Sequence, residues 1–283
     1  MTKGDGLTLN FIKSLLYGLI VGISEFLPIS SQGHQAIFGA VFGFRSPEPL
    51  RDILIHIAML VAVVLANSTY LDRIKREIQL SSLSASRRKH TDRRAAQDLR
   101  LIRAAMIPML MLLFINIFTA KLRFNLGLTA LFFVINGVIV YIPEHIGKFS
   151  KDANQMSGLD AFLIGITSAL SVFPGISRIG CGYSYATARG ADGKKAYHWL
   201  IALSIVALLV LLLCDIIGIF FTGIGSISFV GFLGYLLSAG GAFAGAVLGM
   251  HLMKLVIDRS GYAFFGFYCW GAALLSFLLH LFA

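Results

Sequence analysis

Charged side chains are scarce in this chain. Of its 283 residues only 13% are Asp, Glu, Lys or Arg, whereas 57% are hydrophobic and the mean hydropathy is +0.80. A soluble domain carries about 25% charged residues, so this chain has too few to cover a water-facing surface. That excludes soluble and disordered proteins as first interpretations, and no nucleic-acid partner is expected despite the net charge of +10. We therefore expect one integral membrane domain over residues 1–283.

Cysteine is also rare, and no cleavable leader is visible. The three cysteines, Cys181, Cys214 and Cys269, are widely spaced and form no C-x-x-C motif. We expect small buried side chains from them, rather than disulfides or a zinc site. The first apolar stretch continues into Glu25 without a small-residue cleavage site, so we expect it to belong to the mature protein.

Hydropathy predicts an all-α polytopic membrane protein. A spanning helix needs about 20 mainly apolar residues, and six segments have that character. They cover residues 52–70, 103–120, 126–142, 196–221, 227–250 and 261–282.

Two further apolar stretches are interrupted. The stretch 8–43 is broken at 28–33, and the stretch 158–190 is broken at 174–180, in both cases by Pro, Ser and Gly. The arms beside each break, about 12–18 residues long, are short for a crossing. Both stretches therefore predict re-entrant helix–loop–helix pairs.

The polar stretch 71–103 is strongly basic, with ten Lys and Arg against four acidic residues. An excess of Lys and Arg is typical of cytoplasmic loops. We therefore expect a cytoplasmic loop here that also contacts anionic lipids. Alternating the spans from this loop makes the two re-entrant pairs enter the membrane from opposite sides.

The two breaks resemble each other in sequence. Phe26-Leu27-Pro28-Ile29-Ser30-Ser31-Gln32-Gly33 aligns with Val172-Phe173-Pro174-Gly175-Ile176-Ser177-Arg178-Ile179-Gly180 when one glycine is inserted. With opposite entry sides, they indicate an inverted-topology repeat. Interrupted segments in corresponding halves predict a ligand site near the membrane midplane.

The first break carries acid–base chemistry. Glu25 lies in an apolar stretch, where an ionisable residue is a functional candidate by default. Ser31 and His34 are three residues apart and would share one face of a helix, which places a hydroxyl near an imidazole. Ser30 would help to bind an anion at the helix start, or would serve only as its N-cap.

The second break supplies the opposite charge. The Arg178 guanidinium is suited to holding a phosphate, and Ser177, Gly175 and Gly180 add backbone and hydroxyl donors. Alternatively, Arg178 snorkels to the interface or pairs with Glu25. Together the breaks predict an anion site in the bilayer, for phosphoryl chemistry on a lipid or for small-anion transport.

Three other polar residues near membrane depth are weaker candidates. Asp52 and His56 are four residues apart and would line the site or simply face the bundle. Asp215 is expected at the membrane interface.

The two motifs resemble those of the undecaprenyl-diphosphate phosphatase family, the bacitracin-resistance type of integral membrane phosphatase. The family's first motif, E-G-x-x-E-F-L-P-x-S-S-x-G-H, is matched by residues 21–34 except at Val21, and its second, P-G-x-S-R-x-G, by residues 174–180. The segments "ARGADGKKAYHWLIALSI" and "SGYAFFGFYCWGAALL" also look like family segments, so the resemblance covers most of the chain.

This resemblance implies six spanning helices, two re-entrant pairs and removal of the terminal phosphate of undecaprenyl diphosphate, which recycles the lipid carrier of cell-wall synthesis. By motif position, Ser31 would be the nucleophile and His34 its acid–base partner. Arg178 and Ser177 would hold the diphosphate, and Glu25 would assist a metal ion or proton transfer. The expected setting is a bacterial plasma membrane, with membrane lipids and a possible second copy of the chain as partners.

One position departs from the pattern. Val21 replaces the first motif glutamate, which is expected to help bind a divalent cation, Mg²⁺ or Ca²⁺. Glu25 alone would make a weaker metal site. The departure leaves open a relative that binds or flips a polyprenyl phosphate without hydrolysing it.

Overall fold

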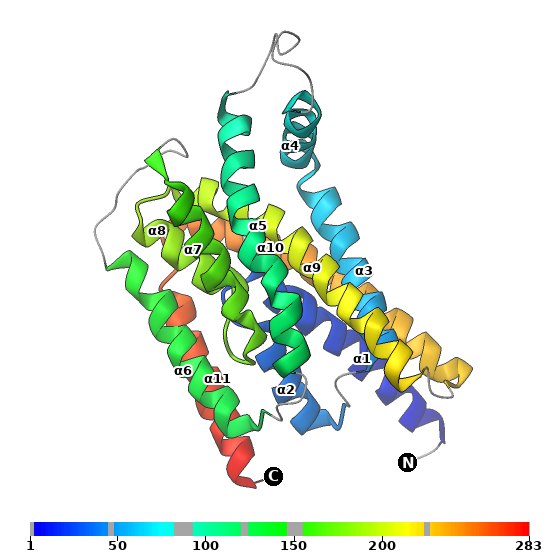
Figure 1. The fold of residues 1–283 in the computed structure, drawn as a ribbon. Helices are drawn as coiled ribbons and strands as arrows, with labels where there is room; N and C mark the ends of the chain where they lie inside the picture. The colour runs from blue at the N-terminus through cyan, green and yellow to red at the C-terminus, as the bar shows by residue number, and fades with distance from the viewer. Residues whose placement is uncertain are drawn as a thin grey trace.

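The structure is a computed structural model that describes residues 3–44, 48–81, 93–119, 124–145, 155–223 and 227–282, without the side chains of 3–9, 112–119 and 222. Within these ranges it is a bundle of α-helices (Figure 1). The helices are α1 (Lys3–Phe26), α2 (Ser31–Phe42), α3 (Pro49–Ala66), α4 (Ser68–Ser81), α5 (Arg93–Thr119), α6 (Leu126–Tyr141), α7 (Gly158–Ala169), α8 (Arg178–Ala188), α9 (Gly193–Thr222), α10 (Phe229–Arg259) and α11 (Phe264–Phe282).

The all-α polytopic fold is confirmed. Among the described residues five helices are long and apolar enough to cross a membrane, in the regions of α3, α6, α9, α10 and α11. The sixth predicted span, 103–120, falls in α5 up to Thr119. Large apolar side chains point outward from the bundle, including Phe220, Phe229 and Phe264, which are 84%, 76% and 69% exposed. A lipid-facing surface accounts for this exposure, because acyl chains rather than water would cover it.

Two predictions about local structure were wrong. The stretch 71–103 is not simply a loop, since α4 continues to Ser81 and α5 begins at Arg93; residues 82–92, with three of its basic residues, lie outside the described part. The first arm is also longer than expected, because α1 has 24 residues. At 1.5 Å per residue it is about 36 Å long, enough to cross the hydrocarbon core.

Helix pairing supports the predicted inverted repeat. α1 packs along α10 as α7 packs along α5, and α2 touches α11 as α8 touches α6. The two halves meet where equivalent helices pair with each other, α3 with α9 and α6 with α11. The pair α6 and α11 is antiparallel, because Gly127 lies against His280 and Gly137 against Trp270. Helix α9 runs opposite to the chain direction of α3 and α4: Asp215 contacts His56 of α3, and the earlier His198 stacks on Tyr70 of α4. Equivalent helices therefore run in opposite directions, as an inverted repeat requires.

Glycine allows α1 and α10 to pack at very short distance. A Cβ at Gly241, Gly245 or Gly249 of α10 would collide with the α1 backbone. Small residues are the usual way for membrane helices to gain close contact. This contact positions the end of α1, from which the first break begins.

Candidate functional site

The two breaks face each other inside the bundle. The first, residues 27–30, joins α1 to α2, and the second, 173–177, leads into α8. The Gly175 N–H donates to Ser30 Oγ at 2.9 Å, and the Ser177 hydroxyl donates to the Leu27 carbonyl at 3.1 Å. Each break is thus hydrogen-bonded to the other through its serine, which brings the predicted anion-site residues together.

The same two serines begin the helices that follow. Ser30 Oγ accepts from the Gly33 N–H at 3.3 Å, and Ser177 Oγ accepts from the Gly180 N–H at 3.0 Å. Both serines are only 2% exposed, and Ser30 has a φ of 66°, unusual for a residue with a side chain. The N-cap interpretation of Ser30 is confirmed. A substrate-binding role for Ser30, Ser177, Gly175 and Gly180 stays a prediction.

Asn136, on α6, connects the two breaks. Its amide donates to the Pro28 carbonyl at 2.9 Å, and its Oδ1 accepts from the Ser177 N–H at 2.8 Å. Asn136 is fully buried. It provides a hydrogen-bond partner for one backbone group of each break. Irregular backbone buried at membrane depth needs such partners, because no water reaches it.

Glu25 and Arg178 form a buried ion pair between the repeats. Arg178 Nη2 lies 2.6 Å from Glu25 Oε1, and the two side chains are 4% and 13% exposed. This confirms the pairing alternative for Arg178. Arg178 Nε is buried and has no hydrogen-bond partner among the described residues, so the guanidinium keeps donor capacity that an additional anion would satisfy.

The hydrogen bonds of His34 define its basic atom. Nδ1 lies 2.7 Å from the Ser30 carbonyl, which can only accept, so Nδ1 carries the proton. In the neutral ring Nε2 is then the acceptor, and it lies 2.7 Å from the Tyr268 hydroxyl on α11. Any base chemistry of His34 therefore belongs to Nε2.

Ser31 is on α2 with His34, as expected, but its partner is different. Ser31 Oγ accepts from Gln35 Nε2 at 3.2 Å. The ring nitrogens of His34 have other partners: Nδ1 bonds to the Ser30 carbonyl and Nε2 to the Tyr268 hydroxyl. The predicted hydroxyl–imidazole contact is thus not formed in this state, because the Ser30 carbonyl and Tyr268 determine the ring orientation. Direct proton transfer would require Nε2 to leave Tyr268.

An acid, a serine, a histidine and an arginine thus lie around two facing breaks, in the chain order of the two motifs. A profile of the bacitracin resistance protein BacA family matches residues 14–275. The chain belongs to this family.

Curated relatives span almost the whole chain. It is 30% identical over 266 residues to an "Undecaprenyl-diphosphatase" of Methanococcus vannielii, covering 93% of this chain and 98% of the relative. Proteins of the same name from Syntrophotalea carbinolica and Carboxydothermus hydrogenoformans are 29% and 28% identical, each covering 93% of this chain and 96% and 94% of the relative.

The side chains of this BacA-family member do not fit a resident metal ion. Val21, at the position of the first motif glutamate, is 2% exposed in the core and offers no ligand atom. Glu25 is engaged by Arg178. Among the described residues, no group of three or more His, Cys, Asp and Glu side chains is arranged to hold a metal. The expected divalent cation therefore has no ready-made protein site here.

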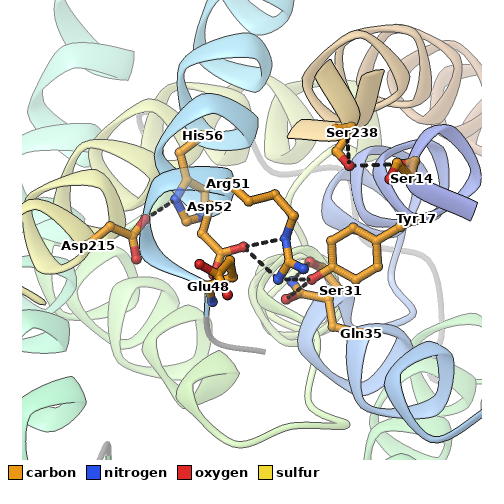
Figure 2. Close-up of polar contacts among 11 residues, drawn as sticks. Ser14, Tyr17, Ser31, Gln35, Glu48, Arg51, Asp52, His56, Asp215 and Ser238 are labelled. Atoms are coloured by element: carbon orange, nitrogen blue, oxygen red, sulfur yellow. Dashed lines mark hydrogen bonds and ion pairs between the residues drawn. The ribbon is translucent and has the colours of Figure 1, made fainter. Parts of the chain in front are cut away.

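A second polar cluster lies near the start of α3 (Figure 2). His56 Nδ1 is 2.6 Å from Asp215 Oδ2, where α3 packs against α9, and the two side chains are 14% and 19% exposed. The expected position of Asp215 at the membrane interface stays a prediction. Asp52 pairs with Arg51 at 3.1 Å. Arg51 in turn contacts Tyr17, which leads back to Ser31 through Gln35.

Sequence reasoning missed Asn136, Tyr268 and Gln35. Asn136 had a usable signal, since a lone amide in an apolar spanning segment is a functional candidate. Gln35 lies four residues after Ser31, which is one helical turn. Tyr268 had no local signal, because its contact with His34 joins positions 234 residues apart.

Proposed function

We propose that this chain hydrolyses undecaprenyl diphosphate to undecaprenyl phosphate and inorganic phosphate, and so recycles the lipid carrier of cell-wall polymers. One observation carries the proposal: the two breaks face each other, and Arg178 at the start of α8 lies 2.6 Å from Glu25 at the end of α1. Membership of the BacA family and the names of the curated relatives give the substrate.

Arg178 is the proposed phosphate-binding group. Its Nε, for which the described residues provide no hydrogen-bond partner, suits a diphosphate, whose charge would otherwise be costly to bury. Gly175, Gly180, Ser30 and Ser177 contribute by keeping the backbone of both breaks in place. Glu25 competes with the phosphate for Arg178, so substrate entry exchanges one anionic partner for another.

Ser31 is the proposed nucleophile. Its Oγ attacks the terminal phosphorus, and the bond from that phosphorus to the bridging oxygen breaks, so that undecaprenyl phosphate leaves with the electron pair. His34 Nε2 takes the serine proton and returns it to the leaving phosphate. Water then attacks the phosphoserine, its proton passes through His34 to the serine oxygen, and inorganic phosphate is released.

Dependence on a divalent cation remains a separate prediction. No step above requires one, because the described side chains provide no resident metal site. Measuring phosphate release with and without a chelator tests whether a cation arrives with the diphosphate.

The same proposal places the chain in a bacterial plasma membrane, with the basic stretch 71–103 in the cytoplasm, and includes a homodimer. Cysteine labelling of intact cells tests the orientation. Light scattering of the protein–detergent complex measures the number of copies.

The decisive experiment is phosphate release from a polyprenyl diphosphate by purified protein. Ser31→Ala and Arg178→Ala should reduce release to background, because they remove the nucleophile and the phosphate-binding charge. Arg259→Ala is the matched control, since Arg259 is exposed in the last turn of α10. If both site variants retain release equal to this control, the assignment of Ser31 and Arg178 is wrong.

A further inference from the structure

A chain of hydrogen bonds leads from a buried cation to the candidate nucleophile (Figure 2). Arg51 Nη2 lies 3.2 Å from the Tyr17 hydroxyl, Tyr17 donates to Gln35 Oε1 at 3.1 Å, and Gln35 Nε2 donates to Ser31 Oγ at 3.2 Å. The four residues come from α3, α1 and α2. The chain therefore joins three helices at Ser31.

Arg51 determines the direction of every bond in this chain. A guanidinium can only donate, so the Tyr17 oxygen accepts from it and the single Tyr17 proton goes to Gln35. That turns the amide oxygen of Gln35 toward Tyr17 and its NH₂ group toward Ser31. Ser31 Oγ consequently accepts, and its own proton must point to another acceptor.

Several contacts hold Arg51 in this position. Arg51 is 3% exposed and pairs with Asp52 at 3.1 Å. Its guanidinium carbon lies 4.4 Å from the centre of the Tyr17 ring, which also stacks on Phe44 at 5.1 Å. Consecutive hydrogen bonds that begin at a charge polarise one another in surroundings of low dielectric constant.

We propose that Arg51, Tyr17 and Gln35 are positioning residues that activate Ser31. They keep the Ser31 oxygen as an acceptor, so its proton is available to a base, and the Gln35 N–H stabilises negative charge on that oxygen as the proton leaves. This inference rests on the proposed function, because it needs Ser31 to be the nucleophile. It adds a source of activation that does not involve Arg178.

Tyr17→Phe tests the chain while it keeps the ring and its stacking. Because the lost bond acts on the developing alkoxide, we expect kcat for phosphate release to fall about tenfold while KM stays within twofold. A purely structural role would instead lower the unfolding temperature or the fraction of active protein. The control is Tyr197→Phe, since the Tyr197 hydroxyl is also buried but has no hydrogen-bond partner in the described part of the chain; its kcat should stay within twofold of the wild type.

Gln35→Met gives an independent test at a half-buried position, and the two changes form a double-mutant cycle. If Tyr17 acts through Gln35, the double variant should be no slower than Gln35→Met alone. Multiplying losses would mean that the two residues act separately, and would overturn the proposal.

The outcomes separate this inference from the proposed function. Absence of phosphate release by the wild type contradicts the proposed function itself. Full release by Ser31→Ala contradicts the assignment of Ser31 as the nucleophile, and with it this inference. If wild-type release depends on Ser31 but Tyr17→Phe and Gln35→Met both keep wild-type kcat, the proposed function stands and the positioning chain is refuted.

Discussion

Gly175 occupies a backbone conformation that no other residue would adopt easily. Its φ is +112°, and a Cβ there would lie 2.7 Å from Phe132 Cβ, 2.7 Å from the Thr129 carbonyl and 2.8 Å from the Phe133 nitrogen. None of these atoms is the end of a flexible side chain, so a methyl group has nowhere to move. Gly175→Ala should therefore strain the second break and disturb the N–H that donates to Ser30.

Two costs add in this variant. Forcing a residue with a side chain into such a backbone conformation costs about 1–3 kcal/mol, and overpacking a tight site costs about 1–3 kcal/mol. We expect a loss of about 3–4 kcal/mol of stability, which lowers the unfolding temperature by about 10 °C for a chain of this size. Phosphate release should fall as well, because Ser30 and Ser177 lose their alignment.

Thermal unfolding of the detergent-solubilised protein measures the stability, and release is measured well below the variant's unfolding temperature. Gly240→Ala is the control, since a Cβ there meets nothing within 4 Å and Gly240 has no positive φ. That control should unfold within about 2–4 °C of the wild type, a change of roughly 1 kcal/mol. If Gly175→Ala unfolds at the wild-type temperature, the geometry of the second break is wrong.

Three further predictions follow from the ion pair, the bridging amide and a helix cap. Asn136→Leu leaves the Pro28 carbonyl and the Ser177 N–H unpaired, so stability should fall by about 2–4 kcal/mol in thermal unfolding; no loss would contradict the bridge. Glu25→Gln removes the anion that competes for Arg178, so KM should fall, and a rise in KM would refute this competition. Burial acts to raise the pKa of the Asp160 carboxyl, but hydrogen bonds from Ser157 and Arg189 outweigh it and hold that pKa below its ordinary value. Its contribution to stability is therefore complete above about pH 4 and is lost as pH falls through the lowered pKa. Asp160→Asn should remove this acid dependence. At pH 7 it should lower the stability by about 1 kcal/mol, because the Ser157 side chain still caps α7. A pH dependence of stability equal to that of the wild type would contradict this role of Asp160.

The repeat shows how far local sequence information reaches. Pro28 and Pro174 interrupt apolar stretches, and proline restricts both its own φ and the residue before it, so both helix breaks were predictable. The serine caps at Ser30 and Ser177 follow the same local chemistry. The length of α1 was misjudged because its start lies in a polar segment with no apolar periodicity.

Sequence by itself determined the membrane environment, the spanning segments, the paired breaks and the residue types of the site. These follow from composition and short-range backbone chemistry, which depend on neighbours within a few residues. Only the tertiary structure decided that Arg178 pairs with Glu25, that Tyr268 rather than Ser31 contacts His34, and that Arg51 reaches Ser31 through Tyr17 and Gln35. Most of these contacts join helices far apart in sequence, and their partners are determined by helix packing, which no local pattern records.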